Sequence, residues 1–287
     1  PIYVGIDSED VWSNQENFLL DKDCRPTFIA GVPPDYFSKT GQRWGNPLYD
    51  WDFMQKDGFK FWLSRLSYNA ELFDYIRIDH FRAFDTYWKI PSSCPTAEVG
   101  AWIEAPGYAL FDTIFAHYPN LKIIAEDLGD LRPQVLTLRD HYGFPGMKIV
   151  QFTFNPNEKQ ERLNGTYRPY FHDRANMIVY TGTHDNQTVK GWFTDYDRKT
   201  KARIVALLKS WGYKTDDISL AFCAYTLDNL ADTAILPMQD ILSFTDRARM
   251  NRPGTIGSPN WEWKMVSFDG FKKRIPTLRK MIQKSRR

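Results

Sequence analysis

Short apolar runs that end in charged residues recur along this sequence, and helical patterns separate them. The apolar runs lie at residues 2–6, 75–81, 121–129, 147–152, 177–186 and 233–238. Apolar residues recur at helical spacing at residues 55–73, 107–117, 132–142, 198–211, 215–230 and 268–284. Continuous apolar strands that alternate with helices are typical of a parallel sheet covered by helices on both faces. The sequence therefore predicts an α/β fold.

Acidic residues follow four of the predicted strands, at Asp7, Asp79, Glu126 and Asp185. In a (β/α)8 barrel the carboxyl ends of all strands meet on one face, where the active sites of such barrels lie. No glycine-rich phosphate loop follows any of the strands, so nucleotide-binding open sheets would lack their usual site. We therefore predict a barrel. Six strands do not complete eight, so either two strands precede Pro1 or the sheet is open.

The run at residues 75–81 carries Arg77 and then Asp79 near its end. Side chains alternate between the two faces of a strand, so these two residues lie on the same face. Charged side chains are costly to bury unless they are paired or used. The pattern predicts either a structural ion pair at a strand end or two residues that share a pocket, and both alternatives stay open at this point.

Residues 13–54 show little periodicity and contain many aromatic residues. Loops of this length inside a domain are uncommon and usually functional. Aromatic rings exposed in such a loop either pack on the domain or bind a ligand. The sequence has 10 Trp, 15 Tyr and 20 Phe, and this surplus suits a ligand with flat apolar faces such as a sugar. We predict a substrate-binding loop region at residues 13–54.

Two kinds of chemistry fit Asp79, Glu126 and Asp185 if they share one face. A divalent metal would need oxygen ligands in number, with help from His80 and His184. Glycoside chemistry needs two carboxyl groups, one as the nucleophile and one as the general acid/base. The absence of tight ligand spacing and the aromatic loop favour the sugar chemistry.

Simpler structural roles compete with this interpretation. Glu126 and Asp127 could be an acidic pair that caps the following helix. His184 could be a polar residue at the end of a strand without further function.

The composition excludes several classes of partner. The 37 basic and 35 acidic residues leave a net charge of +2, so there is no electrostatic case for nucleic acid or for an anionic membrane. The apolar runs are too short to span a bilayer, and the start resembles no signal peptide. Cys24, Cys94 and Cys223 are sparse and in no metal-ligand spacing, which suits a reducing compartment. We expect a cytoplasmic protein.

Three motifs in order resemble those of the α-amylase clan: RIDHF at 77–81, AEDLG at 125–129 and THDN at 183–186. The segments PPDYF at 33–37 and GQRWGNP at 41–47 narrow the resemblance to the 4-α-glucanotransferases of glycoside hydrolase family 77. Residues 1–12 and 249–255 fit the same family.

The resemblance implies a (β/α)8 barrel and a retaining double displacement on malto-oligosaccharides, starch or glycogen glucans. It implies that Asp79 is the nucleophile, that Glu126 is the general acid/base, and that Asp185 is a third acid that holds sugar hydroxyls. The family needs no metal and no organic cofactor. The resemblance also implies substrate-binding roles for Arg77, His184, Asp7, Trp44, Tyr36, Phe37, Asn46 and Asn251.

Family members carry a longer N-terminal part that holds the first two strands. We therefore expect residues 1–287 to be the C-terminal portion of the usual catalytic barrel, with strands three to eight. We expect this chain to be an inefficient enzyme without an upstream segment. An α-glucan hydrolase of the same clan and an inactive glucan-binding fragment are the alternative functions.

Overall fold

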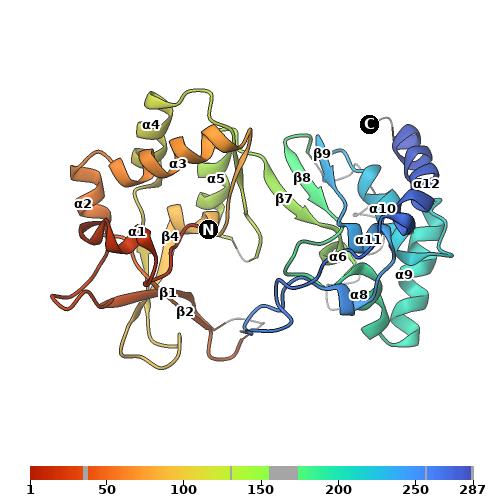
Figure 1. Cartoon of the computed structure of the whole chain (residues 1–287), viewed down its shortest axis with the longest axis horizontal. Coiled ribbons are helices and arrows are strands. Elements are labelled where there is room, and N and C mark those ends of the chain that lie inside the picture. Colours follow the sequence, from red (N-terminus) through yellow and green to blue (C-terminus); the bar gives the residue numbers. More distant parts are fainter. Residues whose placement is uncertain (35–37, 130, 155–173, 256, 286–287) are drawn as a thin grey trace. The chain divides into compact units, whose positions relative to one another are not determined.

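The computed structural model describes residues 1–34, 38–129, 131–154, 174–255 and 257–285. The chain divides into two compact units, Pro1–Gly146 and Met147–Arg287 (Figure 1). Both units contain helices and strands, so the predicted α/β class is confirmed. The assignment of residues 1–287 to a single barrel portion stays a prediction.

The first unit contains a parallel strand pair and a separate antiparallel sheet. Strands β3 and β6 are parallel and directly paired, and the antiparallel sheet has the order β2-β1-β4-β5. The strands are β1 (Phe28–Val32), β2 (Gln42–Pro47), β3 (Ile76–Ile78), β4 (Thr86–Pro91), β5 (Ala101–Glu104) and β6 (Ile123–Ala125). The helices are α1 (Glu9–Trp12), α2 (Trp51–Lys56), α3 (Lys60–Leu72), α4 (Gly107–His117) and α5 (Pro133–His141).

The antiparallel sheet corrects the expectation of a long irregular loop over residues 13–54. Strands β1 and β2 lie inside that stretch, and β1 pairs with β4 so that Gly31 faces Trp88. Gly31 is required here, because a Cβ atom at this position would lie 2.1 Å from the carbonyl oxygen of Gln42. The sequence does not show this sheet because β2 reads QRWGNP, which lacks an apolar alternation.

Two further expectations were wrong in the first unit. Residues 2–6 form no strand, although Ile2, Tyr3 and Val4 are buried, and the Ile2 amide donates to the carbonyl oxygen of Asp79 at 3.3 Å. The predicted helix over residues 55–73 is two helices, α2 and α3. The break lies at Gly58 and Phe59, whose φ angles of 80° and 56° are left-handed and cannot continue a helix.

Aromatic side chains fill the core of the first unit. Trp62 is buried between Tyr49 and Phe84, with ring centroids 5.5 and 5.3 Å away. Phe111 lies 5.1 Å from Phe84 and continues this cluster. A large part of the aromatic surplus is therefore core, and these rings belong to the same apolar cluster as Ile78 of β3 and Ile123 and Ala125 of β6.

The second unit is built on a sheet with the strand order β7-β8-β9, of which β8 and β9 are parallel. The strands are β7 (Gly146–Ile149), which begins at the boundary of the two units, β8 (Met177–Tyr180) and β9 (Thr233–Ile235). The helices are α6 (Val150–Thr153), α8 (Val189–Asp195), α9 (Arg198–Ser210), α10 (Ile218–Leu227), α11 (Met238–Ile241) and α12 (Asp269–Ser285).

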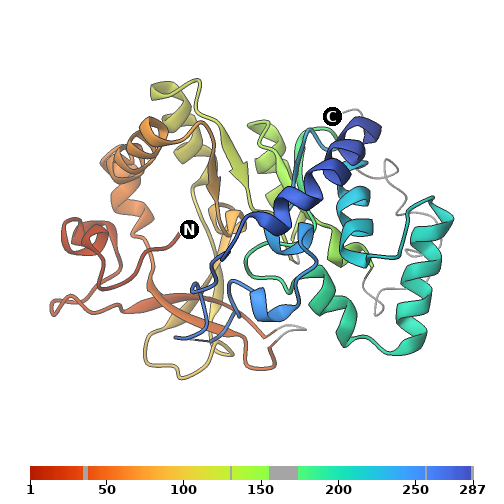
Figure 2. The same cartoon turned by 45° about the vertical axis from the view of Figure 1, so that its right-hand side comes forward.

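The helices of the second unit begin and pack as their sequences indicate. Asp197 and Asp217 cap α9 and α10 by accepting backbone N–H bonds in the first turn. Helix α12 packs on α10 (Figure 2). Leu278 of α12 and Cys223 of α10 belong to the same buried apolar cluster. The strand predicted over residues 147–152 ends at Ile149, where α6 follows. Among the described residues no helix has the length and apolar character needed to cross a membrane.

Candidate active site

The parallel register of β3 and β6 brings two of the predicted catalytic acids next to each other. Ile78 pairs with Ala125, and Asp79 and Glu126 are the residues that follow. Backbone hydrogen bonds continue past the strands, since the Glu126 amide donates to the carbonyl of Ile78 at 2.9 Å. Adjacent strands lie about 4.8 Å apart, so these two side chains leave the same end of the sheet as neighbours.

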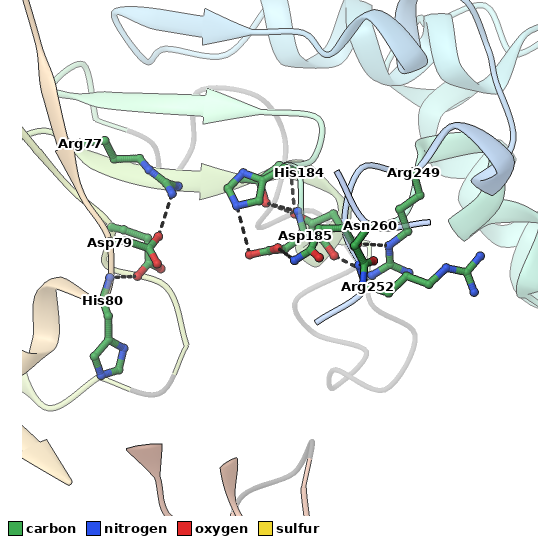
Figure 3. A network of polar contacts seen from close by, with 12 residues as sticks. Arg77, Asp79, His80, His184, Asp185, Arg249, Arg252 and Asn260 are labelled. Carbon is green, nitrogen blue, oxygen red and sulfur yellow. Dashed lines mark hydrogen bonds and ion pairs between the residues drawn. The ribbon is translucent and has the colours of Figure 1, made fainter. Parts of the chain in front are cut away.

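Asp79 forms an ion pair with Arg77, whose Nη2 lies 2.8 Å from Oδ1 (Figure 3). The side chains are 47% and 28% exposed, respectively. The pair keeps a positive charge beside the carboxylate, and the carboxylate still reaches solvent. Of the two alternatives left open by the sequence, the structure shows the ion pair, and a pocket shared by both residues stays a prediction, since the cavity beside Asp79 is not lined by Arg77.

Glu126 lies in a different electrostatic environment from Asp79. Its Oε2 accepts from the amide of His80 at 2.8 Å, and its Oε1 accepts from the amide of Leu128 at 3.0 Å. Burial, followed by the negative charge of Asp79, raises the pKa of Glu126 to about 7, against the opposing effect of these two amides and of Arg77. A carboxyl group with this pKa both donates and accepts a proton near neutral pH.

His80 supports Glu126 through its backbone rather than through its ring. Its φ of 55° is left-handed, and its amide donates to the Glu126 carboxylate at 2.8 Å. Its ring packs edge-on against Trp44, with centroids 4.8 Å apart. Burial, with the nearby charge of Arg82, lowers the pKa of His80 to about 4, so its imidazole is neutral at pH 7. The sequence suggested His80 only as a possible metal ligand and missed this role of its backbone.

A cavity of about 490 Å³ opens beside Asp79 within the first unit. Trp44, Asn46 and His80 line it together with the N-terminal segment, so two of the predicted binding residues reach the same space as the nucleophile candidate. The side-chain amide of Asn46 donates to the carbonyl of Val4 at 2.9 Å and so links β2 to the N-terminal segment. The lining excludes Asp7, which is exposed.

Tyr36 and Phe37 lie outside the described residues, so their predicted binding role stays a prediction.

Asp127 has a structural role that separates it from Glu126. Its carboxylate forms a buried ion pair with Arg139 of α5, and both side chains are less than a tenth exposed. The N-cap residue of α5 is Arg132, with no side-chain cap bond, so the acidic pair does not cap this helix. Adjacent residues point to opposite sides of an extended chain, which is why one acid faces the site and the other faces α5.

The second unit carries a polar cluster at the segment that follows β8. The Asp185 carboxylate accepts from the side-chain amide of Asn251 at 2.7 Å, and the Nε2 atom of His184 lies 3.4 Å from its other oxygen. Arg249 donates to the Asp185 carbonyl at 2.6 Å (Figure 3). The structure therefore brings together Asp185, His184 and Asn251, three of the predicted site residues.

Trp261 and Arg249 belong to this cluster and were not among the predicted site residues. The Trp261 ring lies 5.1 Å from that of His184, and its amide donates to the carbonyl of Met250 at 2.7 Å. Trp261 is 59% exposed. The sequence signal for Trp261 was a tryptophan in a segment rich in Gly, Pro and Asn. Such a segment lacks the apolar pattern of a core element, so its aromatic ring is a candidate for an exposed binding residue.

The part of the chain that the structure describes holds no group of three or more His, Cys, Asp and Glu side chains placed to bind a metal ion.

The family model of glycoside hydrolase family 77, described as 4-alpha-glucanotransferase, matches residues 1–268. The chain belongs to this family. It is 43% identical over 290 residues to the 4-alpha-glucanotransferase of Thermus thermophilus, and this match covers 100% of the chain and 57% of that protein. It is 43% identical over 286 residues to the chloroplastic/amyloplastic 4-alpha-glucanotransferase of Arabidopsis thaliana, and this match covers 98% of the chain and 48% of that protein.

A solved structure has the same fold. The amylomaltase from Streptococcus agalactiae in complex with acarbose superposes with a TM-score of 0.91 at 38% identity, over 100% of this chain and 56% of that one. The chain therefore spans about half the length of the glycoside hydrolase family 77 members that it matches.

Proposed function

We propose that this chain carries the catalytic residues of a 4-α-glucanotransferase, which moves α-1,4-glucan segments between malto-oligosaccharides and between starch or glycogen chains. Asp79 and Glu126 carry this proposal. They are neighbours on two parallel strands, yet one is paired with an arginine and the other has a pKa of about 7. Two carboxyl groups in contrasting environments are what a retaining glycosidase mechanism needs.

In the first step the ionised Asp79 attacks the anomeric carbon of the donor glucan. The bond from that carbon to the glycosidic oxygen breaks, and Glu126 delivers its proton to the leaving oxygen. The glucan segment is then an ester of Asp79, and Glu126 is a carboxylate. Arg77 is the ion-pair partner of the Asp79 carboxylate, with its Nη2 atom 2.8 Å from Oδ1.

In the second step Glu126 takes the proton of the 4-hydroxyl of an acceptor glucan. The acceptor oxygen attacks the anomeric carbon, the bond to Asp79 breaks, and Asp79 returns as a carboxylate. The configuration at the anomeric carbon is retained because two inversions have occurred. Retention leads us to expect about 5–5.5 Å between the two carboxyl groups.

The remaining residues hold sugar in this proposal. Asp185, with Asn251 and His184, binds hydroxyls of the donor sugar. Trp44, together with Tyr36 and Phe37, contacts the acceptor glucan, since an aromatic face packs well on a sugar ring.

We also propose that residues 1–287 are the C-terminal catalytic portion of a (β/α)8 barrel, with an N-terminal segment supplying the rest. In this proposal residues 2–6 take the place of the third strand, although they form no strand in this structure. The coverage of about half of each relative supports this. It leads us to expect that the 287-residue chain is a poor enzyme alone. The test is the intact mass and N-terminal sequence of the native protein, followed by activity with and without the N-terminal portion of a relative.

The reaction itself is tested by incubating the protein, with any native upstream segment, with maltotriose. Glucose together with longer oligosaccharides supports transfer, whereas reducing ends that rise steadily would indicate a hydrolase. Asp79→Asn and Glu126→Gln should abolish turnover, and Glu71→Gln, which alters an exposed acid of α3, should not. Binding of maltoheptaose without turnover, unchanged in Asp79→Asn, would indicate an inactive glucan-binding protein instead.

We further propose a cytoplasmic location. Cys24, Cys94 and Cys223 are all free, which suits a reducing compartment.

A further inference from the structure

Arg249 joins two segments of the second unit that lie far apart in the sequence. Its Nη2 donates to the backbone carbonyl of Asp185 at 2.6 Å, and its Nε donates to the backbone carbonyl of Asn251 at 2.8 Å. The side chain is 19% exposed. One planar guanidinium therefore links the segment after β8 to the segment that carries Asn251.

The backbone amide and the backbone carbonyl of Asn251 both form hydrogen bonds. Its amide donates to the carbonyl of His184 at 3.1 Å, while its own carbonyl accepts from Arg249. Its side-chain amide then reaches the Asp185 carboxylate at 2.7 Å. The orientation of that carboxylate thus depends on a residue whose own place depends on Arg249.

The Arg249 guanidinium also lies near the carboxylate of Asp246, which is hydrogen-bonded to the segment that follows β8. Asp246 Oδ2 lies 3.9 Å from Nη1 of Arg249 and accepts from the side-chain amide of Gln187 at 2.8 Å. Asp246 Oδ1 accepts from the amide of Thr188 at 3.0 Å. Arg249 therefore lies between the carboxylate of Asp246 and the two backbone carbonyls of Asp185 and Asn251.

We propose that Arg249 is a positioning residue that fixes the Asp185 carboxylate and the Asn251 amide in the geometry that binds glucan. This inference rests on the proposed function, in which Asp185 and Asn251 hold sugar hydroxyls. Lysine cannot replace Arg249 fully, because a single ammonium lacks the fork that spans both carbonyls.

The first test needs no ligand and follows hydrogen–deuterium exchange in the full chain. Arg249→Ala should accelerate exchange in peptides that cover residues 184–189 and 249–252, and Arg249→Lys should have a smaller effect. Arg247→Ala is the matched control, since Arg247 is exposed and two residues away. Unchanged exchange in Arg249→Ala would overturn the positioning role.

The second test measures acarbose affinity by calorimetry in the wild type, Arg249→Ala, Asp185→Asn and the double variant. Arg249→Ala should weaken acarbose binding about tenfold, which is the scale of one charge-assisted hydrogen bond. If Arg249 acts through Asp185 and Asn251, Arg249→Ala should weaken binding less in the Asp185→Asn background than in the wild type. Additive losses, or unchanged affinity in Arg249→Ala, would refute the proposal.

The two tests separate this inference from the proposed function. If the wild type does not bind acarbose, the proposed function fails, and the exchange experiment still decides whether Arg249 positions Asn251.

Discussion

Replacing Glu126 with glutamine should stabilise the first unit at alkaline pH and leave its stability nearly unchanged at acidic pH. Burial and the charge of Asp79 raise the pKa of Glu126 from its ordinary value of 4.5 to about 7. The folded state then binds a proton that the unfolded state has lost, so the free energy of unfolding falls as pH rises from 4.5 to 7. Glutamine resembles the protonated acid and carries no such loss.

The size of the effect follows from the two pKa values. The difference between 7 and 4.5, at about 1.4 kcal/mol for each tenfold change, corresponds to roughly 3 kcal/mol above pH 7. His80 contributes in the opposite direction, because its pKa of about 4 makes stability fall as pH drops below 6.5. That contribution is present in both proteins and cancels in the comparison.

Urea unfolding of the wild type and of Glu126→Gln at pH 4.5 and pH 8 measures this difference, with Glu71→Gln as the exposed control. We expect the free energies of unfolding to agree at pH 4.5 and to differ by about 3 kcal/mol in favour of glutamine at pH 8. An equal difference at the two pH values, or a less stable glutamine variant at pH 8, would show that Glu126 is not held in the environment described above.

Three further outcomes follow from the same contacts. Asp79→Asn should lower the pKa of Glu126, because it removes a negative charge that raises this pKa. A carboxyl-carbon NMR titration measures the pKa of Glu126, and an unchanged value would contradict the prediction. Arg139→Met should destabilise the protein by about 3–5 kcal/mol, because it removes the cation that pairs with the buried carboxylate of Asp127. A much smaller loss in urea unfolding would contradict this. Trp44→Ala should weaken maltotriose as an acceptor more than as a donor, and an equal change in both steady-state constants would count against its placement on the acceptor side.

Much of the candidate site is predictable from local sequence. Arg77 and Asp79 are two residues apart on a strand, and the alternation of side chains alone predicts that they share a face. The helices over 107–117 and 198–211 are predictable for the same reason, since their apolar spacing is local. The motifs that contain Asp79, Glu126 and Asp185 indicated the clan, and the segments at 33–37 and 41–47 indicated the family that the family model confirms.

Pairing between distant segments was not predictable in this way. The antiparallel sheet of the first unit depends on β1 meeting β4, and no pattern within β2 indicates a strand. Residues 2–6 have the apolar composition of a strand but do not form one, because a strand is defined by its partners and not by its composition.

The sequence alone indicates candidate residues for the chemistry and which of them share one side of a strand, because both inferences depend on neighbours along the chain. How those candidates differ from one another depends on contacts that form only when the chain folds. The His80 amide meets the carboxylate of Glu126 across 46 residues, and Asn251 meets Asp185 across 66. Burial and charge at Glu126 are sums over residues brought together by folding, so the contrast between the two acids appears only once the chain has folded.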